Sequence, residues 1–335
     1  MEYRKIGESE LELSVITFGA WAIGGWMWGG AERTDAIKAI RAAYDEGVTS
    51  IDTAPIYGQG TSEEIVGEAI KGLPRHKLQI LTKFGMRWDL KKGDHAFNSV
   101  DNAGNPIEIY KYAGPESIIK ECEDSLRRLG TDYIDLYQIH WPDVTTPIEE
   151  SMTAVTSLLR QGKIRAAGVC NYSAAQMQTA EKVVKLTSNQ VPYSMLERRI
   201  EKELVPYCIE NNKSILAYSP LQRGLLTGKI RPGHQFASGD HRPGTAFYAP
   251  ANIERVNAFL DKIRPLANEK NITLSQLVLR WTIMQPGITI ALAGARNAEQ
   301  AVQNAKAGDI QLSPADISFI DEQLSELKQM PSASA

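Results

Sequence analysis

The chain has 335 residues, of which 43% are hydrophobic, and this is enough apolar content to bury a large core. The formal net charge is −3 and no basic stripe is present, so binding to nucleic acid or to an anionic membrane has no electrostatic support. No run approaches the ~20 apolar residues of a membrane span, and the first residues lack a signal-peptide core. We therefore expect a cytoplasmic protein in which residues 1–335 form one domain, with a loose tail at 329–335.

Short apolar runs bounded by turn residues alternate along the chain with amphipathic segments. Strands separated by helices in this way are typical of a parallel sheet, and eight such units close into a barrel. The sequence therefore predicts an α/β protein with the (β/α)8 fold, the TIM barrel. The predicted strands are residues 13–19, 50–52, 78–83, 133–140, 166–171, 188–191, 214–218 and 288–294.

The predicted helices have recognisable ends. One begins at Pro115 and stops at Gly130, the C′ glycine that helices prefer. Its predicted apolar face consists of Ile118, Ile119, Cys122 and Leu126. At residues 61–64, 146–149 and 173–176 a hydroxyl precedes an acid or amide by three positions, which predicts three N-terminal capping pairs. The helix that starts at the second pair should end at Gly162.

Four polar residues lie at or just past the ends of predicted strands: Asp52, Tyr57, Lys83 and His140. In a barrel these ends meet at one mouth. An ammonium beside Tyr57 should lower its pKa from about 10. Tyr57 could then protonate the oxygen of a carbonyl that is being reduced, while His140 donates a hydrogen bond to that oxygen. Taken singly, each residue could be a core ion pair or a half-buried aromatic, but their joint placement favours a site.

The segments around these residues resemble the aldo-keto reductase family. Residues 47–58 and 62–67 are similar to its most specific signature, and residues 129–140 and 162–171 match it in order and spacing. The chain looks most like the branch of bacterial stress proteins and inositol dehydrogenases. The resemblance implies that Asp52, Tyr57, Lys83 and His140 form the catalytic tetrad, with Tyr57 as general acid or base. It also implies an N-terminal hairpin that plugs the bottom of the barrel.

No glycine-rich dinucleotide motif or phosphate loop is present, so a nicotinamide cofactor would have to bind in another way. The resemblance implies that it lies extended across the barrel mouth, with Asn171 and Gln190 at its carboxamide and Tyr218 stacked on its ring. Arg223 could equally be a solvated surface charge. The candidate cofactor residues are Cys170, Asn171, Gln190, Tyr218, Ser219, Leu221, Arg223, Gly224, Gly294, Arg296, Gln300 and Asn304.

Arg296 stands at the start of the last βα helix. A guanidinium beside free helix N–H groups makes a phosphate site. By the resemblance this is the pocket for an adenosine 2′-phosphate, so we predict NADPH, with NADH possible but less favoured. A solvated charge at a helix start is the alternative interpretation of Arg296.

Several tryptophans could wall an apolar substrate pocket: Trp21, Trp26, Trp28, Trp88 and Trp141. Two long loops, residues 84–114 and 222–250, should lie at the same C-terminal face, and long structureless loops in a compact domain are usually functional or mobile. The sequence does not identify the substrate.

Other functions remain open at this point. The same fold could act as an NAD(P)-dependent dehydrogenase of sugars, inositols or secondary alcohols, or as a non-catalytic redox-sensing subunit. A metal-dependent hydrolase would lack ligands, because of the five histidines only His140 follows a strand and the others should be solvated. We expect no metal and a monomer, with Cys122 and Cys208 as small core residues.

Overall fold

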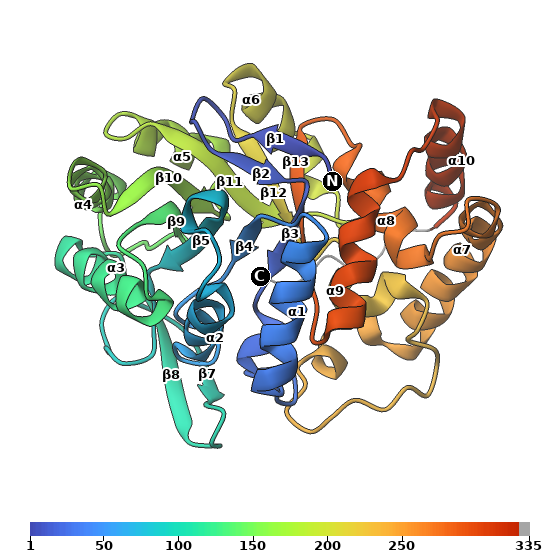
Figure 1. Ribbon diagram of the computed structural model, residues 1–335, viewed down its shortest axis with the longest axis horizontal. Coiled ribbons are helices and arrows are strands. Elements are labelled where there is room, and N and C mark those ends of the chain that lie inside the picture. Colours follow the sequence, from blue (N-terminus) through green and yellow to red (C-terminus); the bar gives the residue numbers. More distant parts are fainter. Residues whose placement is uncertain (328–335) are drawn as a thin grey trace.

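The structure is a computed structural model that describes residues 1–327, so the expected tail at 329–335 lies outside the described residues. Eight strands form a closed barrel, and every neighbouring pair is parallel. Figure 1 shows the helices around this ring. The prediction of a (β/α)8 barrel is confirmed. The barrel strands are β3 (Ile16–Gly19), β4 (Ser50–Asp52), β5 (Gln79–Phe84), β9 (Ile134–Ile139), β10 (Ile164–Cys170), β11 (Leu186–Pro192), β12 (Ser214–Tyr218) and β13 (Ile288–Gly294).

The first predicted strand is split in the structure. β1 (Tyr3–Lys5) and β2 (Glu12–Ser14) form the N-terminal hairpin, and the chain enters the barrel only after Val15. The amide of Val15 donates to Glu2 in the hairpin, while its carbonyl accepts from Ala291 in β13. A prediction of one strand over 13–19 was therefore wrong at its start. Residues 13 and 14 belong to the hairpin, and Val15 forms hydrogen bonds with both the hairpin and the barrel.

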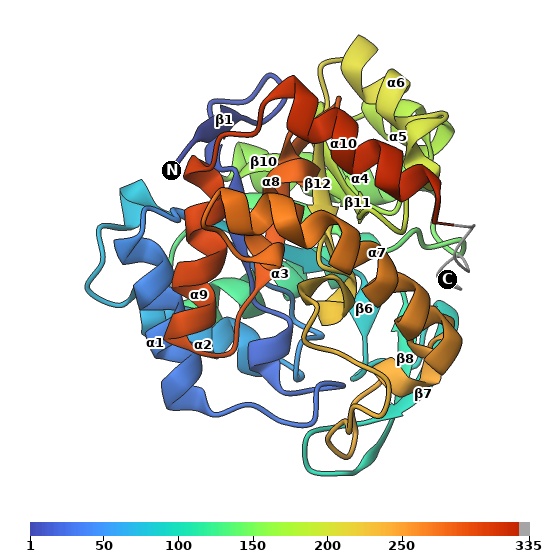
Figure 2. The ribbon, with the colours of Figure 1, turned by 90° about the vertical axis from the view of Figure 1, so that its right-hand side faces the viewer.

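The hairpin plugs the lower end of the barrel, as expected. Ile6, Leu11 and Leu13 are buried against inward-facing barrel residues, among them Leu81 and Leu136. Burial of such side chains contributes roughly 1.5–3 kcal/mol each. Figures 1 and 2 place β1 at one end of the barrel and strands β7 and β8 at the other.

The helices that surround the barrel confirm some predicted ends and correct others. Ser173 and Gln176 form the predicted capping box. The other two pairs do not cap, because Gly60 and Pro147 occupy the N-cap positions and neither has a side chain that can accept. The helices are α1 (Arg33–Asp45), α2 (Thr61–Ile70), α3 (Pro115–Leu129), α4 (Ile148–Arg160), α5 (Ala174–Glu181), α6 (Leu204–Glu210), α7 (Pro250–Glu269), α8 (Leu274–Ile283), α9 (Ala298–Ala305) and α10 (Pro314–Ser325).

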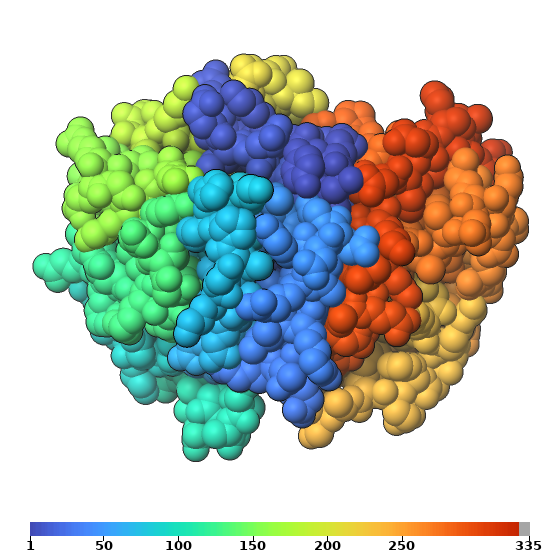
Figure 3. All heavy atoms as spheres, viewed as in Figure 1, coloured from blue at the N-terminus to red at the C-terminus, as the bar shows by residue number. Residues whose placement is uncertain are grey.

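Helix packing leaves one predicted core residue outside. Ile119 of α3 is 37% exposed, whereas Ile118, Cys122 and Leu126 are buried as predicted. On the face where the barrel closes between β13 and β3, α1 and α9 lie side by side (Figure 3). Among residues 1–327, no helix has both the length and the apolar character needed to cross a bilayer.

The first long loop is not structureless. Residues 84–114 contain a small antiparallel sheet of β6 (Met86–Arg87), β8 (Pro106–Lys111) and β7 (Asp94–Val100). Asp101 accepts hydrogen bonds from two amides of the β7–β8 turn, so this hairpin had a local sequence signal. The indole of Trp26 donates to the carbonyl of Val100 at 2.9 Å and ties the sheet to the β3–α1 connection.

The second long loop, residues 222–250, contains short 3₁₀ turns: Gln222–Thr227, Arg242–Gly244 and Ala246–Tyr248. The hydroxyl of Tyr248 lies 2.8 Å from the carbonyl oxygen of Arg223 and 2.9 Å from that of Gln222. Both loops lie at the carboxyl ends of the barrel strands.

Candidate active site

The four residues of the expected tetrad meet at this mouth. Asp52 ends β4, Lys83 lies near the end of β5, and His140 directly follows β9. The Nζ of Lys83 donates to Asp52 Oδ1 at 2.6 Å, to the carbonyl of Thr53 at 2.9 Å and to Tyr57 Oη at 3.3 Å. The rings of Tyr57 and His140 meet edge to face with centroids 5.6 Å apart. One ammonium therefore joins the acid and the phenol beside the imidazole.

Burial decides the electrostatics of this group. Lys83 and Asp52 are only 1% and 2% exposed. Burial alone would lower the pKa of Lys83, but the charge of Asp52 and the groups around it outweigh that effect and raise it. Burial, followed by the nearby charge of Lys83, holds the pKa of His140 well below its usual range. At neutral pH the site therefore contains a charged Lys83 and a neutral imidazole.

The expected lowering of the Tyr57 pKa is not what the structure gives. Burial raises the pKa of Tyr57 to about 12, and the positive charge of Lys83 offsets only part of this rise. The sequence argument took the neighbouring charge into account but not the loss of solvent around the phenol. The consequence is a hydroxyl that is fully protonated at neutral pH.

One cavity of about 540 Å³ extends from the tetrad in both directions. All twelve candidate cofactor residues line it, together with Asp52, Tyr57 and His140. Lys83 lies behind that lining and reaches the cavity through its partners.

Most of the tryptophans that were predicted to wall a substrate pocket lie at the cavity. Trp21, Trp26 and Trp141 line the cavity, and Trp28 does too. Trp88 does not line the cavity and packs instead against the small apolar cluster that contains Trp26 and Met86.

Met86 and Phe97 line the cavity in place of Trp88, and the sequence analysis missed them. They lie on β6 and β7. The turn signal of the β7–β8 hairpin in the sequence could have pointed to this region.

The two amides expected at the carboxamide are tied to the tetrad. Gln190 Nε2 donates to Asp52 Oδ2 at 2.8 Å. Asn171 Nδ2 donates to the carbonyl of His140 at 3.1 Å, and its Oδ1 accepts from the hydroxyl of Tyr218 at 3.1 Å. Cys170 is buried beside them, and burial strongly raises the pKa of its thiol. These contacts fix the amide orientations before any ligand binds.

The part of the cavity away from the tetrad is lined by cationic side chains. Arg223, Lys229 and Arg296 line it, and within residues 1–327 none of the three forms an ion pair with an acidic side chain. Arg223 is half-buried with its guanidinium 5.7 Å from the ring centroid of Trp21, so it is not a solvated surface charge. The carboxylate in the lining, Asp52, is already bonded to Lys83. Cations without acidic partners at a cavity favour an anionic ligand.

The far end of the cavity is the start of α9. Asn297 caps this helix by accepting from the amide of Gln300 at 2.9 Å, and Gln300 Oε1 accepts from the amide of Arg296 at 3.0 Å. Asn304 Nδ2 donates to the carbonyl of Gly294 at 3.0 Å. The guanidinium of Arg296 is exposed beside this helix start, as a phosphate site requires. Gln303 also lines the cavity and was missed, although its spacing of three from Gln300 places it on the same helix face.

Two of the histidines that were expected in solvent lie at the mouth: His234 is exposed but lines the cavity, and His241 is half-buried. The ring of His241 contacts the rings of Trp21 and Trp28, with centroid distances of 5.1 and 5.2 Å, and its Nδ1 is 2.6 Å from the carbonyl oxygen of Met27. Burial lowers its pKa. Over residues 1–327, no three His, Cys, Asp or Glu side chains are grouped as a metal site would need.

Comparison with known proteins decides the family. Residues 15–325 match the family model described as "Aldo/keto reductase family". The chain belongs to this family. Members of the aldo/keto reductase family are oxidoreductases that act on carbonyl and alcohol groups. The protein is 42% identical over 306 residues to aldo-keto reductase YhdN of Bacillus subtilis. The aligned residues cover 90% of this chain and 86% of that relative.

Other relatives of this aldo/keto reductase have more specific names. A protein of Escherichia coli named NADH-specific methylglyoxal reductase is 37% identical, over 97% of this chain and 98% of its own. The structure of glycerol dehydrogenase AKR11B4 from Gluconobacter oxydans superposes with a TM-score of 0.87 at 38% identity, covering 98% and 97% of the two chains. An aldo-keto reductase of Klebsiella pneumoniae in complex with NADPH gives a TM-score of 0.72 at 30% identity over both whole chains.

Proposed function

We propose that this aldo/keto reductase reduces aldehydes and ketones to alcohols with NADPH, and that Tyr57 is the general acid. The observation that carries the proposal is the contact of Lys83 Nζ with both Asp52 and Tyr57 in the wall of a cavity. A core ion pair would not need a phenol as its third member. The geometry suits delivery of a proton to an oxygen bound beside Tyr57.

The cavity fits a nicotinamide dinucleotide. It connects the tetrad with Arg223, Lys229 and Arg296, whose charges have no acidic partners within residues 1–327 and suit phosphate groups. Asn171 and Gln190 would hold the carboxamide, and Tyr218 would support the ring. When bound, the reduced cofactor supplies a hydride to the carbonyl carbon.

The residues of the chain control the proton. Tyr57 is protonated at neutral pH because burial raises its pKa to about 12, so it can give its proton to the carbonyl oxygen. The phenolate left behind is stabilised by Lys83 at 3.3 Å. Asp52 keeps Lys83 charged and in place through the 2.6 Å contact. His140, neutral because burial lowers its pKa, can orient the carbonyl by a hydrogen bond without adding a positive charge.

The experiment that tests this proposal is Tyr57→Phe. We expect turnover to fall by about 10³-fold, while cofactor affinity changes little, because the proton donor is lost and the cofactor contacts remain. Steady-state kinetics with an aldehyde panel and fluorescence titration with NADPH measure the two quantities. Tyr193→Phe is the control, since Tyr193 is a buried tyrosine that lies outside the cavity and donates to Glu201. Retained reductase activity in the Tyr57 variant would contradict the assignment.

We infer NADPH in preference to NADH from Arg296 at the start of α9. An exposed guanidinium beside a capped helix start suits a 2′-phosphate, which NADH lacks. Structures of relatives from Klebsiella pneumoniae are titled as complexes with NADP and NADPH, whereas the Escherichia coli relative is named NADH-specific. The preference therefore depends on this end of the cavity.

A second candidate is oxidation of a polyol or secondary alcohol, and the relative titled glycerol dehydrogenase favours it. Oxidation needs Tyr57 as a base, and a pKa of about 12 leaves little phenolate at pH 7. We therefore expect oxidation of glycerol by NADP⁺ to accelerate by about tenfold per pH unit between pH 7 and 10. Initial rates in both directions measure this. A larger rate of oxidation than of aldehyde reduction at pH 7 would favour the dehydrogenase.

We also propose that the protein is a cytoplasmic monomer of one domain. The relatives are named as reductases or dehydrogenases, which supports an enzyme over a redox-sensing subunit. Size-exclusion chromatography with light scattering tests the monomer, and an apparent mass of twice the chain's 37.0 kDa would contradict it.

A further inference from the structure

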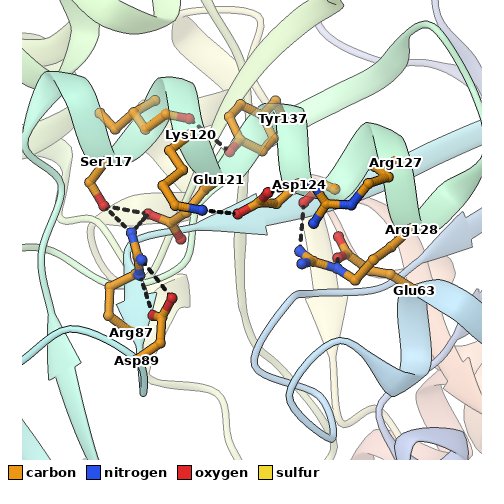
Figure 4. A network of polar contacts seen from close by, with 12 residues as sticks. Glu63, Arg87, Asp89, Ser117, Lys120, Glu121, Asp124, Arg127, Arg128 and Tyr137 are labelled. Carbon is orange, nitrogen blue, oxygen red and sulfur yellow. Dashed lines mark hydrogen bonds and ion pairs between the residues drawn. The ribbon is translucent and has the colours of Figure 1, made fainter.

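A buried carboxylate lies behind the tetrad and takes no part in the cavity lining. Glu121 of α3 is 5% exposed (Figure 4). Its Oε2 accepts from the amide of Gly85 at 2.9 Å. Its Oε1 accepts from the hydroxyl of Ser117 at 3.0 Å and lies 3.5 Å from Arg87 Nη1. These contacts connect an outer helix to the chain where it leaves β5.

The amide bound by Glu121 belongs to a peptide group that also holds His140. Gly85 contributes the N–H of this peptide and Phe84 contributes its C=O, which accepts from the amide of His140 at 2.9 Å. Gly85 has a φ of +88°, where glycine has no steric preference, so hydrogen bonds rather than local sterics set the peptide's orientation. Hydrogen bonds in a chain polarise one another. The carboxylate therefore acts on the backbone of His140 through one peptide group.

The same carboxylate reaches the wall of the cavity through Arg87. Arg87 is 5% exposed and donates to both oxygens of Asp89 at 2.9 Å, in addition to its contact with Glu121. It is one of the two residues of β6, and the other, Met86, lines the cavity. Glu121 thus contacts both the strand end beside the tetrad and the strand that carries part of the substrate wall.

The polar groups that face Glu121 come from two places, β6 with the residues just after it and β9. Arg87 and Asp89 lie on and just after β6, and Tyr137 faces it from β9, where its hydroxyl donates to the carbonyl of Ile118. Burial raises the pKa of Glu121 to about 7, although the charge of Arg87 opposes the rise.

The remaining charged residues drawn in Figure 4 have other partners. Lys120 and Arg127 contact Asp124, and Arg128 contacts Glu63.

We propose that Glu121 is a positioning residue for carbonyl reduction, whose ionised side chain aligns the peptide that holds His140 and the strand that carries Met86. The inference rests on the proposed role of His140. Protonation replaces a charged acceptor by a weaker one for Gly85 and for Arg87. Reduction therefore becomes less efficient as the pH falls through the titration of Glu121.

The chain contains a matched control at the other end of β5. Asp135 of β9 is also buried, accepts from a β5 amide, that of Ile80, at 2.9 Å, and pairs with an arginine, Arg75, at 2.7 Å. Burial raises the pKa of Asp135 as well. Neither Asp135 nor Arg75 lines the cavity. Asp135→Asn therefore repeats the chemistry of Glu121→Gln away from the tetrad.

The first test measures kcat/KM for an aldehyde between pH 5.5 and 9, with NADPH affinity determined in parallel. We expect the wild type and Asp135→Asn to lose about tenfold in kcat/KM below pH 7. Glu121→Gln should show no such loss and should be about tenfold less efficient than the wild type at pH 8.5, with unchanged NADPH affinity. An unaltered acidic limb in Glu121→Gln, or its loss in Asp135→Asn, would overturn the proposal.

The second test needs no turnover and no variant. In the ¹⁵N-labelled wild-type protein, the amide signals of Gly85 and His140 should titrate together with a midpoint near pH 7, the value expected for Glu121. Independent titration of the two amides, or none, would reject the inference even if Glu121→Gln does not fold. If the amides titrate together but no carbonyl in the panel is reduced, the proposed function fails and the link between Glu121 and His140 stands.

Discussion

The two ends of the barrel hold their charges in opposite ways. At the lower end, the buried Asp135 lies between Arg75 and Arg165, with contacts of 2.7 and 3.2 Å. At the mouth, three cations that line the cavity form no ion pair within residues 1–327, namely Arg223, Lys229 and Arg296, whereas Arg242 in the same lining pairs with Asp240. We therefore expect that the pairing of a charge, more than its residue type, separates a structural role from a binding role.

Lys83 and Asp52 combine features of the two ends of the barrel. They form a buried ion pair like those of the lower end, yet Lys83 also contacts Tyr57. Removal of one partner from such a pair leaves an uncompensated charge, and this is costly anywhere in the barrel. At the mouth it should cost activity as well.

The largest expected effect is that of Lys83→Met. We expect a loss of about 3–5 kcal/mol in the free energy of unfolding, because Asp52 is left buried without its partner. Turnover should fall by about 10³-fold, since the Tyr57 phenolate loses its cation. Urea unfolding and steady-state kinetics measure the two effects.

A second variant separates these two effects. Adding Asp52→Asn to Lys83→Met should restore part of the stability and none of the activity. Recovery of activity in the double variant would mean that Lys83 acts only by keeping Asp52 paired.

A smaller effect is expected at Arg296. Arg296→Ala should raise the KM for NADPH by about tenfold and leave that for NADH unchanged, because a charged hydrogen bond to phosphate is worth about 1.5–3 kcal/mol. Arg33→Ala is the control, since Arg33 is half-exposed and paired with Glu68 at 2.7 Å. Equal changes for the two cofactors in Arg296→Ala would place the 2′-phosphate elsewhere.

The sequence predicts much of this arrangement because strand ends are local features. Asp52, Lys83 and His140 each terminate an apolar run, and in a parallel barrel such ends must meet. Contacts between residues far apart in the chain could not be predicted. Gln190 bonds Asp52 from 138 residues away, and no periodicity signals that pair.

The features that the sequence did not predict all depend on the tertiary structure. The sign of the Tyr57 pKa shift follows from burial, which the sequence near Tyr57 does not fix. Phe97 rather than Trp88 lines the cavity because pairing of β7 with β8 determines which side chains face inward. His241 becomes part of the mouth only because a long loop folds back onto Trp21 and Trp28.

The pairing of β13 with β3 has a consequence for biosynthesis. These strands bring residues 291–294 against residues 16–19, so the ring joins two segments that are far apart in the sequence. The ribosome must synthesise both segments and everything between them before the ring can close, and contacts so distant in sequence form slowly. Until then that edge of β3 has no partner strand, and an unpaired strand edge is a site at which another chain can pair.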